Sequence, residues 1–388
     1  DTIAHLATGA WLTKNNADPA AASTTAPAVA TVATVATATA ATTDVRDLDR
    51  LAGWLADRHA ELIARHGLTG HAVVGEHRFR WATDFDFAWM RGWGRNQTEG
   101  PVERNVVVVI PGRDRGRALI LADHYDTAYC EDVYDGRIGG PVGAGTRRAA
   151  AGADDNHSAT AALLMAADVL LPMAKAGQLA HDVWLVHLTG EEFPGDCLGA
   201  RHLARAIVAG DLTIHEAGSD RPIALGGVEI AGAIVMDMIA HRDPRAGYRF
   251  QIAPGESADA MRVAAALHRA TEAWNRGAAR WNRAPARASA RPYRRRERGT
   301  RVPAIAPHPT LVGELRPHWH WSSTVFNTDA QCWSDLGLPI ALVMEHYDID
   351  RQGYHDSHDT LANIDLDFGA AIAAIAIEAA TALATDGA

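Results

Sequence analysis

The chain has 388 residues, of which 47% are hydrophobic and 22% are charged, so it can bury a sizeable core and has the composition of a soluble globular protein. Its formal net charge of −10 disfavours nucleic-acid binding and favours cationic ligands, including metal ions. Lys14 and Lys175 are the only lysines, so the glycine-lysine pair of a phosphate-binding loop is absent, which disfavours kinase and ATPase activity.

The spacing of the cysteines and the hydropathy of the sequence further restrict the class of protein. The three cysteines form neither a disulfide framework nor a Cys-x-x-Cys metal motif, which leaves the redox compartment open. No run of about 18 or more uninterrupted apolar residues occurs, because Glu378 interrupts the apolar segment at 368–384. We therefore expect no membrane span.

The apolar pattern predicts helices that alternate with strands. Residues 1–42 are rich in Ala, Thr and Val without a sustained period, and we expect an extended or mobile leader there. A helix that starts near Thr43 and ends at Gly67 opens the folded domain. Strands are then expected at 105–110, 118–122, 183–188, 231–238 and 339–345, and helices at 158–171, 198–208, 257–274 and 368–384. The alternation predicts an α/β fold, a single three-layer domain over residues 43–388 with a mainly parallel central sheet flanked by helices.

One long segment, residues 277–322, does not fit this alternation. It carries an arginine cluster at 291–301 and then the run His-Trp-His-Trp at 318–321. Because it is longer than an ordinary connection, we expect an excursion from the core. This excursion is either a solvated loop or a lid whose tryptophans border the functional site.

Acidic and histidine side chains gather where the expected strands end, which is where open α/β sheets bind their ligands. In chain order, these side chains are His124, Asp155, Glu191, Glu192, Asp237 and His355. A single catalytic zinc ion needs three protein ligands and an open position for water. At least five candidate ligands instead favour two zinc ions, roughly 3.5–4 Å apart, with one bridging carboxylate.

Five short motifs occur at these positions. They are His-Tyr-Asp-Thr at 124–127, Gly-Ala-Asp-Asp-Asn at 152–156, Gly-Glu-Glu at 190–192, Met-Asp-Met-Ile at 236–239 and Tyr-His-x-x-x-Asp-Thr at 354–360. In type and order they resemble the motifs of the co-catalytic di-zinc aminopeptidase family, which includes secreted bacterial leucyl aminopeptidases and glutamate carboxypeptidases. The resemblance covers residues 45–385 and implies a zinc-peptidase-like fold.

The resemblance assigns a role to each candidate residue. It implies that His124 and Asp237 bind one zinc ion, that Glu192 and His355 bind the other, and that Asp155 bridges the two. It further implies that the peptide bond between Asp155 and Asn156 is cis.

Three more residues complete the implied site. Glu191 would be the general base for a hydroxide that bridges the zinc ions and attacks the substrate carbonyl. Asp126 would accept the second N–H of His124 and so fix its tautomer. Tyr354 is expected either to donate to the oxyanion of the tetrahedral intermediate or simply to pack beside its neighbours.

The function implied is a zinc-dependent exopeptidase, most simply an aminopeptidase, that acts on a peptide or aminoacyl substrate. The alternatives are a glutaminyl-cyclase-like aminoacyltransferase with one zinc ion, since these enzymes share the fold, and a carboxypeptidase of the same fold. A serine hydrolase is disfavoured because the sequence has no Gly-x-Ser-x-Gly elbow. The resemblance also implies a secreted or periplasmic protein, and the oligomeric state stays open.

The sequence departs from the family pattern in three places, the first of which is a connection from His124 to Asp155 that is long for the family. The loop after Glu192 is lengthened by Phe-Pro-Gly-Asp-Cys at 193–197, which leaves its path past the metals undecided. Together with the tryptophans at 319, 321 and 333, this loop favours the cyclase alternative, whereas the motif at 152–156 favours the di-zinc hydrolases. Thr-Asp-Ala at 328–330 replaces the usual Ser-Asp-His, and we expect Asp329 at most to support the site from behind its ligands.

Overall fold

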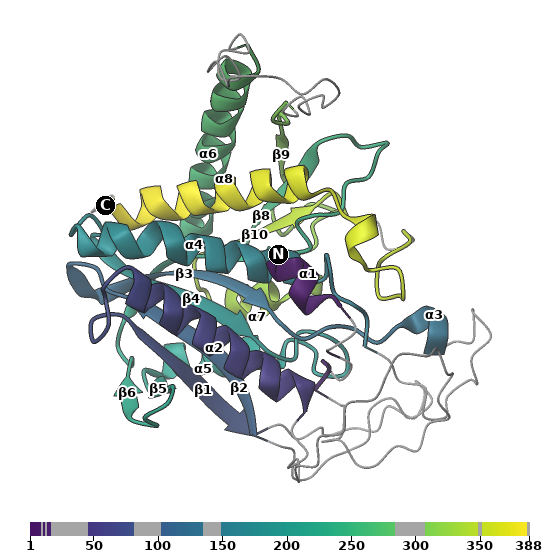
Figure 1. Cartoon of the computed structure of the whole chain (residues 1–388). Helices are drawn as coiled ribbons and strands as arrows, with labels where there is room; N and C mark the ends of the chain where they lie inside the picture. Colours follow the sequence, from purple (N-terminus) through teal and green to yellow (C-terminus); the bar gives the residue numbers. More distant parts are fainter. Residues whose placement is uncertain are drawn as a thin grey trace, which may run out of the picture.

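A ten-stranded sheet forms the centre of the computed structural model, which describes residues 1–8, 11, 14–16, 46–80, 102–134, 149–283, 307–347 and 351–385 (Figure 1). The strands are β1 (Val73–Arg80), β2 (Val102–Ile110), β3 (Asp114–His124), β4 (His181–Leu188), β5 (Thr213–Glu216), β6 (Pro222–Ala224), β7 (Glu229–Asp237), β8 (Arg249–Pro254), β9 (Val312–Leu315) and β10 (Ile340–Glu345). Their order across the sheet is β6-β5-β1-β2-β4-β3-β7-β10-β8-β9.

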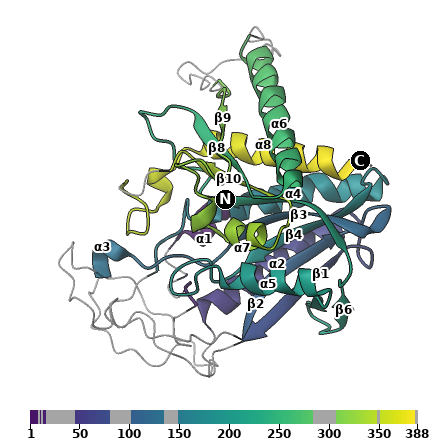
Figure 2. The ribbon, with the colours of Figure 1, turned by 180° about the vertical axis from the view of Figure 1, so that it is seen from behind.

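Helices cover both faces of the sheet (Figure 1, Figure 2). One face carries α1 (Thr2–Leu6), α2 (Asp47–Arg65), α4 (His157–Lys175), α6 (Ala258–Arg283) and α8 (Leu366–Thr385), and the other carries α5 (Leu198–Ala209) and α7 (Asp329–Asp335). The short helix α3 (Glu131–Tyr134) and the 3-10 helices η2 (Val325–Asn327) and η3 (Leu361–Asn363) lie in connections. The chain thus forms the three-layer α/β fold that its sequence predicts.

The central strands are apolar at nearly every position because both of their faces are covered. In β3, Leu119 and Leu121 pack into the core beneath α4 and α8, whereas Ile120 and Ala122 pack into the core beneath α5 and α7. Successive side chains of a strand point to opposite faces, so a strand between two helical layers has no polar side. This burial explains the uninterrupted apolar runs in the sequence.

The centre of the sheet is parallel and its outer strands are mostly antiparallel. β3 pairs in parallel with β4 and with β7, and β7 pairs in parallel with β10. β2 is antiparallel to β4, β1 to β2, and β8 to β10. The predicted α/β class is confirmed, and the sheet is more mixed than expected. Since β3, β4, β7 and β10 run in the same direction, their carboxyl ends meet at one edge of the sheet.

The first residues of the expected leader are folded. Thr2–Leu6 form α1, Leu6 is fully buried in the core, and the His5 ring stacks on Trp54 of α2 at 5.1 Å between centroids. The prediction of an extended or mobile leader is therefore wrong for these residues. Burial of the Leu6 side chain removes apolar surface from water, which stabilises the folded segment. Residues 17–42 lie outside the described residues, so the boundary at 42 stays a prediction.

Two of the described helices, α4 and α8, are long and apolar enough to cross a membrane by length and composition alone. In the structure, 56% of the apolar window of α4 and 67% of that of α8 are buried inside the protein. Core helices of a large α/β domain meet the same criterion, and the expected lack of a membrane span stays a prediction.

The expected excursion is partly built into the fold. Residues 277–283 are the last turns of α6, which extends beyond the sheet (Figure 1), and β9 adds an edge strand by parallel pairing with β8. The arginine cluster at 291–301 lies outside the described residues. Residues 277–322 are therefore not a single loop. The segment begins in α6 and, closer to its end, contains the strand β9.

Candidate metal centre

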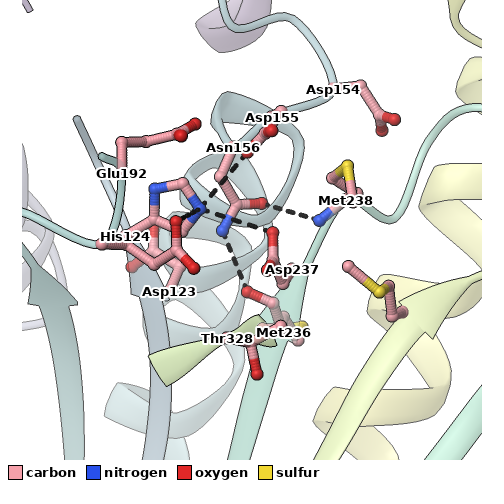
Figure 3. A network of polar contacts seen from close by, with 12 residues as sticks. Asp123, His124, Asp154, Asp155, Asn156, Glu192, Met236, Asp237, Met238 and Thr328 are labelled. Atoms are coloured by element: carbon pink, nitrogen blue, oxygen red, sulfur yellow. Dashed lines mark hydrogen bonds and ion pairs between the residues drawn. The ribbon is translucent and has the colours of Figure 1, made fainter. Parts of the chain in front are cut away.

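Two groups of potential metal ligands meet at the edge where the parallel strands end. One group is His124, Asp155 and Asp237, and the other is Asp155, Glu192 and His355. Figure 3 shows the residues of the first group together with Glu192 of the second. Within each group, the ligand atoms lie within 4.8 Å of one another. The structure thus brings together the five residues that the sequence predicts as ligands, and Asp155 belongs to both groups.

Each histidine reaches the shared carboxylate through its Nε2 atom. His124 Nε2 lies 3.3 Å from Asp155 Oδ1 and 3.4 Å from Asp237 Oδ1. His355 Nε2 lies 3.4 Å from Asp155 Oδ2 and 3.2 Å from Glu192 Oε2. The two oxygen atoms of Asp155 therefore face different groups, which is the arrangement that a bridging carboxylate requires.

The strands and loops explain how these residues reach one edge. β3 ends at His124 and β7 ends at Asp237, so two ligands are the terminal residues of neighbouring parallel strands. Asp155 lies two residues before the start of α4, next to its N-cap Asn156, and His355 lies in the loop after β10. His355 has a φ of 49°, a left-handed backbone conformation that costs free energy in a residue other than glycine and that concentrates at functional sites.

The backbone around Asp155 is held by a carboxylate from a distant part of the chain. Asp359 Oδ1 accepts a hydrogen bond from the Asp154 N–H at 2.8 Å, and Asp359 Oδ2 accepts one from the Asp155 N–H at 3.2 Å. The Asp155–Asn156 peptide bond is cis, which confirms the prediction. Asp359 thereby fixes the orientation of the shared ligand.

Asn156 ties the start of α4 to the end of β7 (Figure 3). Its Nδ2 donates to the Met236 carbonyl at 3.0 Å, and its Oδ1 accepts from the Met238 N–H at 3.1 Å. These two bonds bracket Asp237, so the residue after one ligand fixes the backbone on both sides of another.

The second nitrogen of each histidine also has a partner. His124 Nδ1 lies 3.3 Å from the Asp126 carbonyl oxygen and 3.7 Å from Asp126 Oδ1. His355 Nδ1 lies 3.4 Å from Glu131 Oε1 at the start of α3. Such partners fix the tautomer of a metal-binding histidine and keep its Nε2 free to bind.

Asp126 also holds the adjacent glutamates. Its Oδ1 accepts from the Glu191 N–H at 3.2 Å and its Oδ2 accepts from the Glu192 N–H at 3.1 Å. Two hydrogen bonds that one buried carboxylate accepts fix the backbone of the pair, so Glu191 and Glu192 keep distinct orientations. The sequence predicted a contact of Asp126 with His124 and did not predict these backbone contacts.

Glu191 belongs to neither ligand group but lies beside both. Its Oε2 atom is 3.8 Å from His124 Nε2, and its side chain is 11% exposed. Burial raises the pKa of the Glu191 carboxyl well above its usual range; nearby His124 opposes this rise, and the Asp237 and Glu192 carboxylates reinforce it. A carboxylate that is not itself a metal ligand and lies beside the metal site can both take and return a proton.

The donor set fits divalent zinc. Burial raises the pKa values of Glu192 and Asp237, and Glu192 Oε1 has no hydrogen-bond partner among the described residues. Acids crowded in this way are stabilised in their ionised form by a nearby cation. Imidazole nitrogens together with carboxylate oxygens are common zinc ligands.

A cavity of about 250 Å³ opens onto both ligand groups. Tyr354 lines it and stacks on His355, with the ring centroids 3.9 Å apart. Burial raises the pKa of Tyr354, so its hydroxyl stays protonated and can donate a hydrogen bond. The geometry allows both of the expected roles of Tyr354.

The lengthened loop after Glu192 folds over the acidic pair. The Gly195 N–H donates to the Glu192 carbonyl at 2.8 Å and the Cys197 N–H donates to the Glu191 carbonyl at 2.9 Å. Phe193, Asp196 and Cys197 therefore line the cavity.

The tryptophans of the expected lid do not line this cavity. Trp319 is 71% exposed and Trp321 is 92% exposed, whereas Trp333 is buried in the core and donates to the Ala200 carbonyl. Of the two alternatives for this segment, the lid whose rings at 319 and 321 border the site is not supported, because both rings are exposed to solvent.

Sequence reasoning missed two residues that support the site, Asp359 and Glu131. Asp359 and Glu131 received no role, although Asp359 belongs to the motif at 354–360. Asp329, expected at most as a supporting acid, is buried, and neither of its carboxylate oxygens has a hydrogen-bond partner among the described residues. Burial raises the pKa of Asp329 well above its usual range.

Comparison with known proteins agrees with this geometry. Residues 105–320 match the model of peptidase family M28. This chain belongs to peptidase family M28. The matched segment contains four of the five ligands, and His355 follows it in the same cluster. No curated protein matches the sequence significantly.

Solved structures share the fold of this M28 chain. The LapA aminopeptidase of Legionella pneumophila is 13% identical with a TM-score of 0.53, and the match covers 86% of this chain and 64% of LapA. LapB of the same organism is 13% identical with a TM-score of 0.52, over 88% of this chain and 67% of LapB. A leucine aminopeptidase precursor from Bacteroides thetaiotaomicron is 12% identical with a TM-score of 0.50, over 89% of this chain and 91% of that one.

Proposed function

We propose that this M28 chain is a zinc-dependent exopeptidase that removes residues from the amino terminus of peptides. The observation that carries the proposal is the pair of ligand groups that share Asp155, with Glu191 free beside them and a cavity opening onto both. Membership of a peptidase family supports the reaction class. The aminopeptidase names of LapA and of the Bacteroides protein agree with the proposed direction of attack.

The two ligand groups would hold two zinc ions, one between His124 and Asp237 and one between Glu192 and His355, with Asp155 shared. Zinc at such a site lowers the pKa of bound water to about 7 and polarises a carbonyl oxygen. Glu191, which neither group uses, takes the proton of the attacking water at a carboxylate oxygen and returns it to the leaving amine.

The charge of the cavity favours a free amine over a free carboxylate in the substrate. Among the described residues, no lysine or arginine lines the cavity, whereas Glu191 and Asp196, which belong to neither ligand group, do. A carboxypeptidase needs a cation for the terminal carboxylate of its substrate, because an unpaired buried charge is costly. The acidic lining of the cavity therefore supports an aminopeptidase.

The size of the cavity supports action at a chain end. A volume of about 250 Å³ is below the roughly 300–1,000 Å³ of pockets that hold drug-sized ligands. Phe193, Met238, Phe326 and Met344 belong to its apolar part, so it suits one uncharged side chain. One enclosed residue next to the scissile bond is what an exopeptidase needs.

A matched substrate set tests the proposal. We expect the protein to release the first residue from a leucyl peptide with a free amine. It should also release this residue from the same peptide with an amidated carboxyl end, because the acidic lining of the cavity contacts only the amine. N-acetylation of that peptide should abolish release. Cleavage that requires a free carboxylate would contradict the proposal. Loss of ammonia from a peptide with an N-terminal glutamine, without hydrolysis of the leucyl peptide, would instead support the cyclase alternative.

A further inference from the structure

Three consecutive polar residues from the first part of the chain, Lys14, Asn15 and Asn16, are buried beside the metal centre. Their exposed fractions are 1%, 0% and 2%. Buried polar side chains are costly unless each finds a partner, so a run of three implies that the fold uses their contacts. Each of the three contacts a loop that carries a predicted ligand or the predicted base.

Asn15 joins the loop after β3 to the loop after β4. Its Nδ2 atom donates to the Thr127 carbonyl at 3.1 Å and to the Phe193 carbonyl at 3.1 Å. Thr127 lies three residues after His124, and Phe193 directly follows Glu192. One amide group therefore links a residue near a ligand of the first group to a residue next to a ligand of the second.

The residues on either side of Asn15 hold the neighbouring segments. The Lys14 carbonyl accepts from the Thr127 N–H at 3.0 Å, and Lys14 Nζ donates to the Ala151 carbonyl at 2.7 Å, in the segment that leads to Asp155. Asn16 Nδ2 donates to Thr189 Oγ1 at 3.0 Å, two residues before Glu191.

We propose that Asn15, supported by Lys14 and Asn16, is a positioning residue of the metal centre that sets the distance between its two ligand groups. This inference rests on the proposed function, because the groups it positions are the predicted zinc ligands. The chemistry of an amide suits the role, since both N–H bonds of Nδ2 are used on two carbonyl oxygens. Neither an aliphatic side chain nor a carboxylate can make these donations.

Substitutions at Asn15, with a matched control elsewhere, test the proposal. Asn15→Asp replaces the donor by a carboxylate that faces two carbonyls, and Asn15→Ala removes the donor without adding charge. Asn275 in α6 also bridges to a distant segment, with Nδ2 donating to the Leu311 carbonyl and Oδ1 accepting from the Leu311 N–H, both at 2.8 Å. Asn275→Asp is therefore the same chemical change at a comparable contact away from the metal centre.

Zinc affinity, measured by competition with a chelating dye and without substrate, is the primary measurement. We expect Asn15→Asp to weaken zinc binding by roughly 10–100-fold, as loss of an outer partner of a metal site does, and Asn275→Asp to change it by less than about twofold. Hydrolysis of the leucyl peptide by the zinc-loaded proteins should show a lower kcat with a smaller change in KM. Asn15→Ala gives the same comparison if the aspartate variant does not fold.

Parental zinc affinity and kcat in a folded Asn15 variant would overturn the proposal. Equal losses in the Asn15 and Asn275 variants would overturn it too, because they would reflect stability alone. Failure of the proposed function gives a different result: the parent would then bind zinc and hydrolyse no peptide, and the zinc titration would still decide the role of Asn15.

Discussion

Replacing Glu191 by glutamine is expected to lower kcat by roughly 10²–10⁴-fold while the zinc content of the protein stays the same. The reason is that Glu191 belongs to neither ligand group but lies 3.8 Å from His124 Nε2 at the edge of the cavity. The amide keeps the shape of the side chain and cannot take a proton from water. Steady-state kinetics on a leucyl peptide, with metal analysis of the same sample, measures both quantities.

The adjacent residue gives the matched control. Glu192→Gln changes the same chemical group one position along the chain, where the carboxylate lies 3.2 Å from His355 Nε2. We expect weaker zinc binding at that site, and a loss of activity that added zinc partly restores. If Glu191→Gln loses zinc and Glu192→Gln keeps it, the two roles are reversed.

Asp155→Asn is expected to weaken zinc binding at both sites and to lower kcat by about three orders of magnitude or more. Its two carboxylate oxygens face His124 and His355 separately, so one substitution damages both ligand groups. Loss of the several kcal/mol of transition-state stabilisation that a metal site supplies corresponds to a change of that size, at about 1.4 kcal/mol per tenfold. Zinc titration of the variant, followed by kinetics at saturating zinc, measures both effects.

Asp154→Asn controls for the loss of a buried acid beside the site. The Asp154 carboxylate accepts from the Ala240 and His241 N–H groups at 2.8 and 3.0 Å and from Arg351 Nη2 at 2.7 Å, and it belongs to neither ligand group. We expect this variant to be less stable and still to bind zinc at both sites. Two tightly bound zinc ions in Asp155→Asn, or equal loss of zinc in both variants, would contradict the bridging role.

The sequence predicts the centre of the fold better than its margins. β3, β4 and β7 are covered on both faces, and burial makes their sequences continuously apolar. β1 and β8 escape prediction, since β1 carries exposed charged side chains among its buried ones and β8 contains Arg249, Gln251 and Pro254 among its apolar residues. The spacing of apolar residues in a sequence indicates which side chains are buried and does not indicate which backbone groups pair in a sheet. Strands with polar residues among their buried ones are therefore hard to recognise from the sequence.

The candidate site also has a part that the sequence predicts and a part that it does not. The five ligands and Glu191 stand in short local motifs at strand ends, so their types and order identify them before the fold is known. The supporting contacts join distant positions, such as Asp359 with Asp155 and Asn15 with Phe193, which are separated by 204 and 178 residues. No local pattern contains such pairs, and the Ala-rich and Thr-rich composition of residues 1–42 conceals the three buried polar residues within it.

The number of zinc ions bound per chain tests the central claim most directly. Metal analysis of protein purified without chelator, followed by titration of the zinc-free chain, should give two equivalents, because two ligand groups share Asp155. A stoichiometry of one, unchanged by added zinc, would contradict the two-metal centre and leave the single-zinc transferase as the better interpretation of this chain.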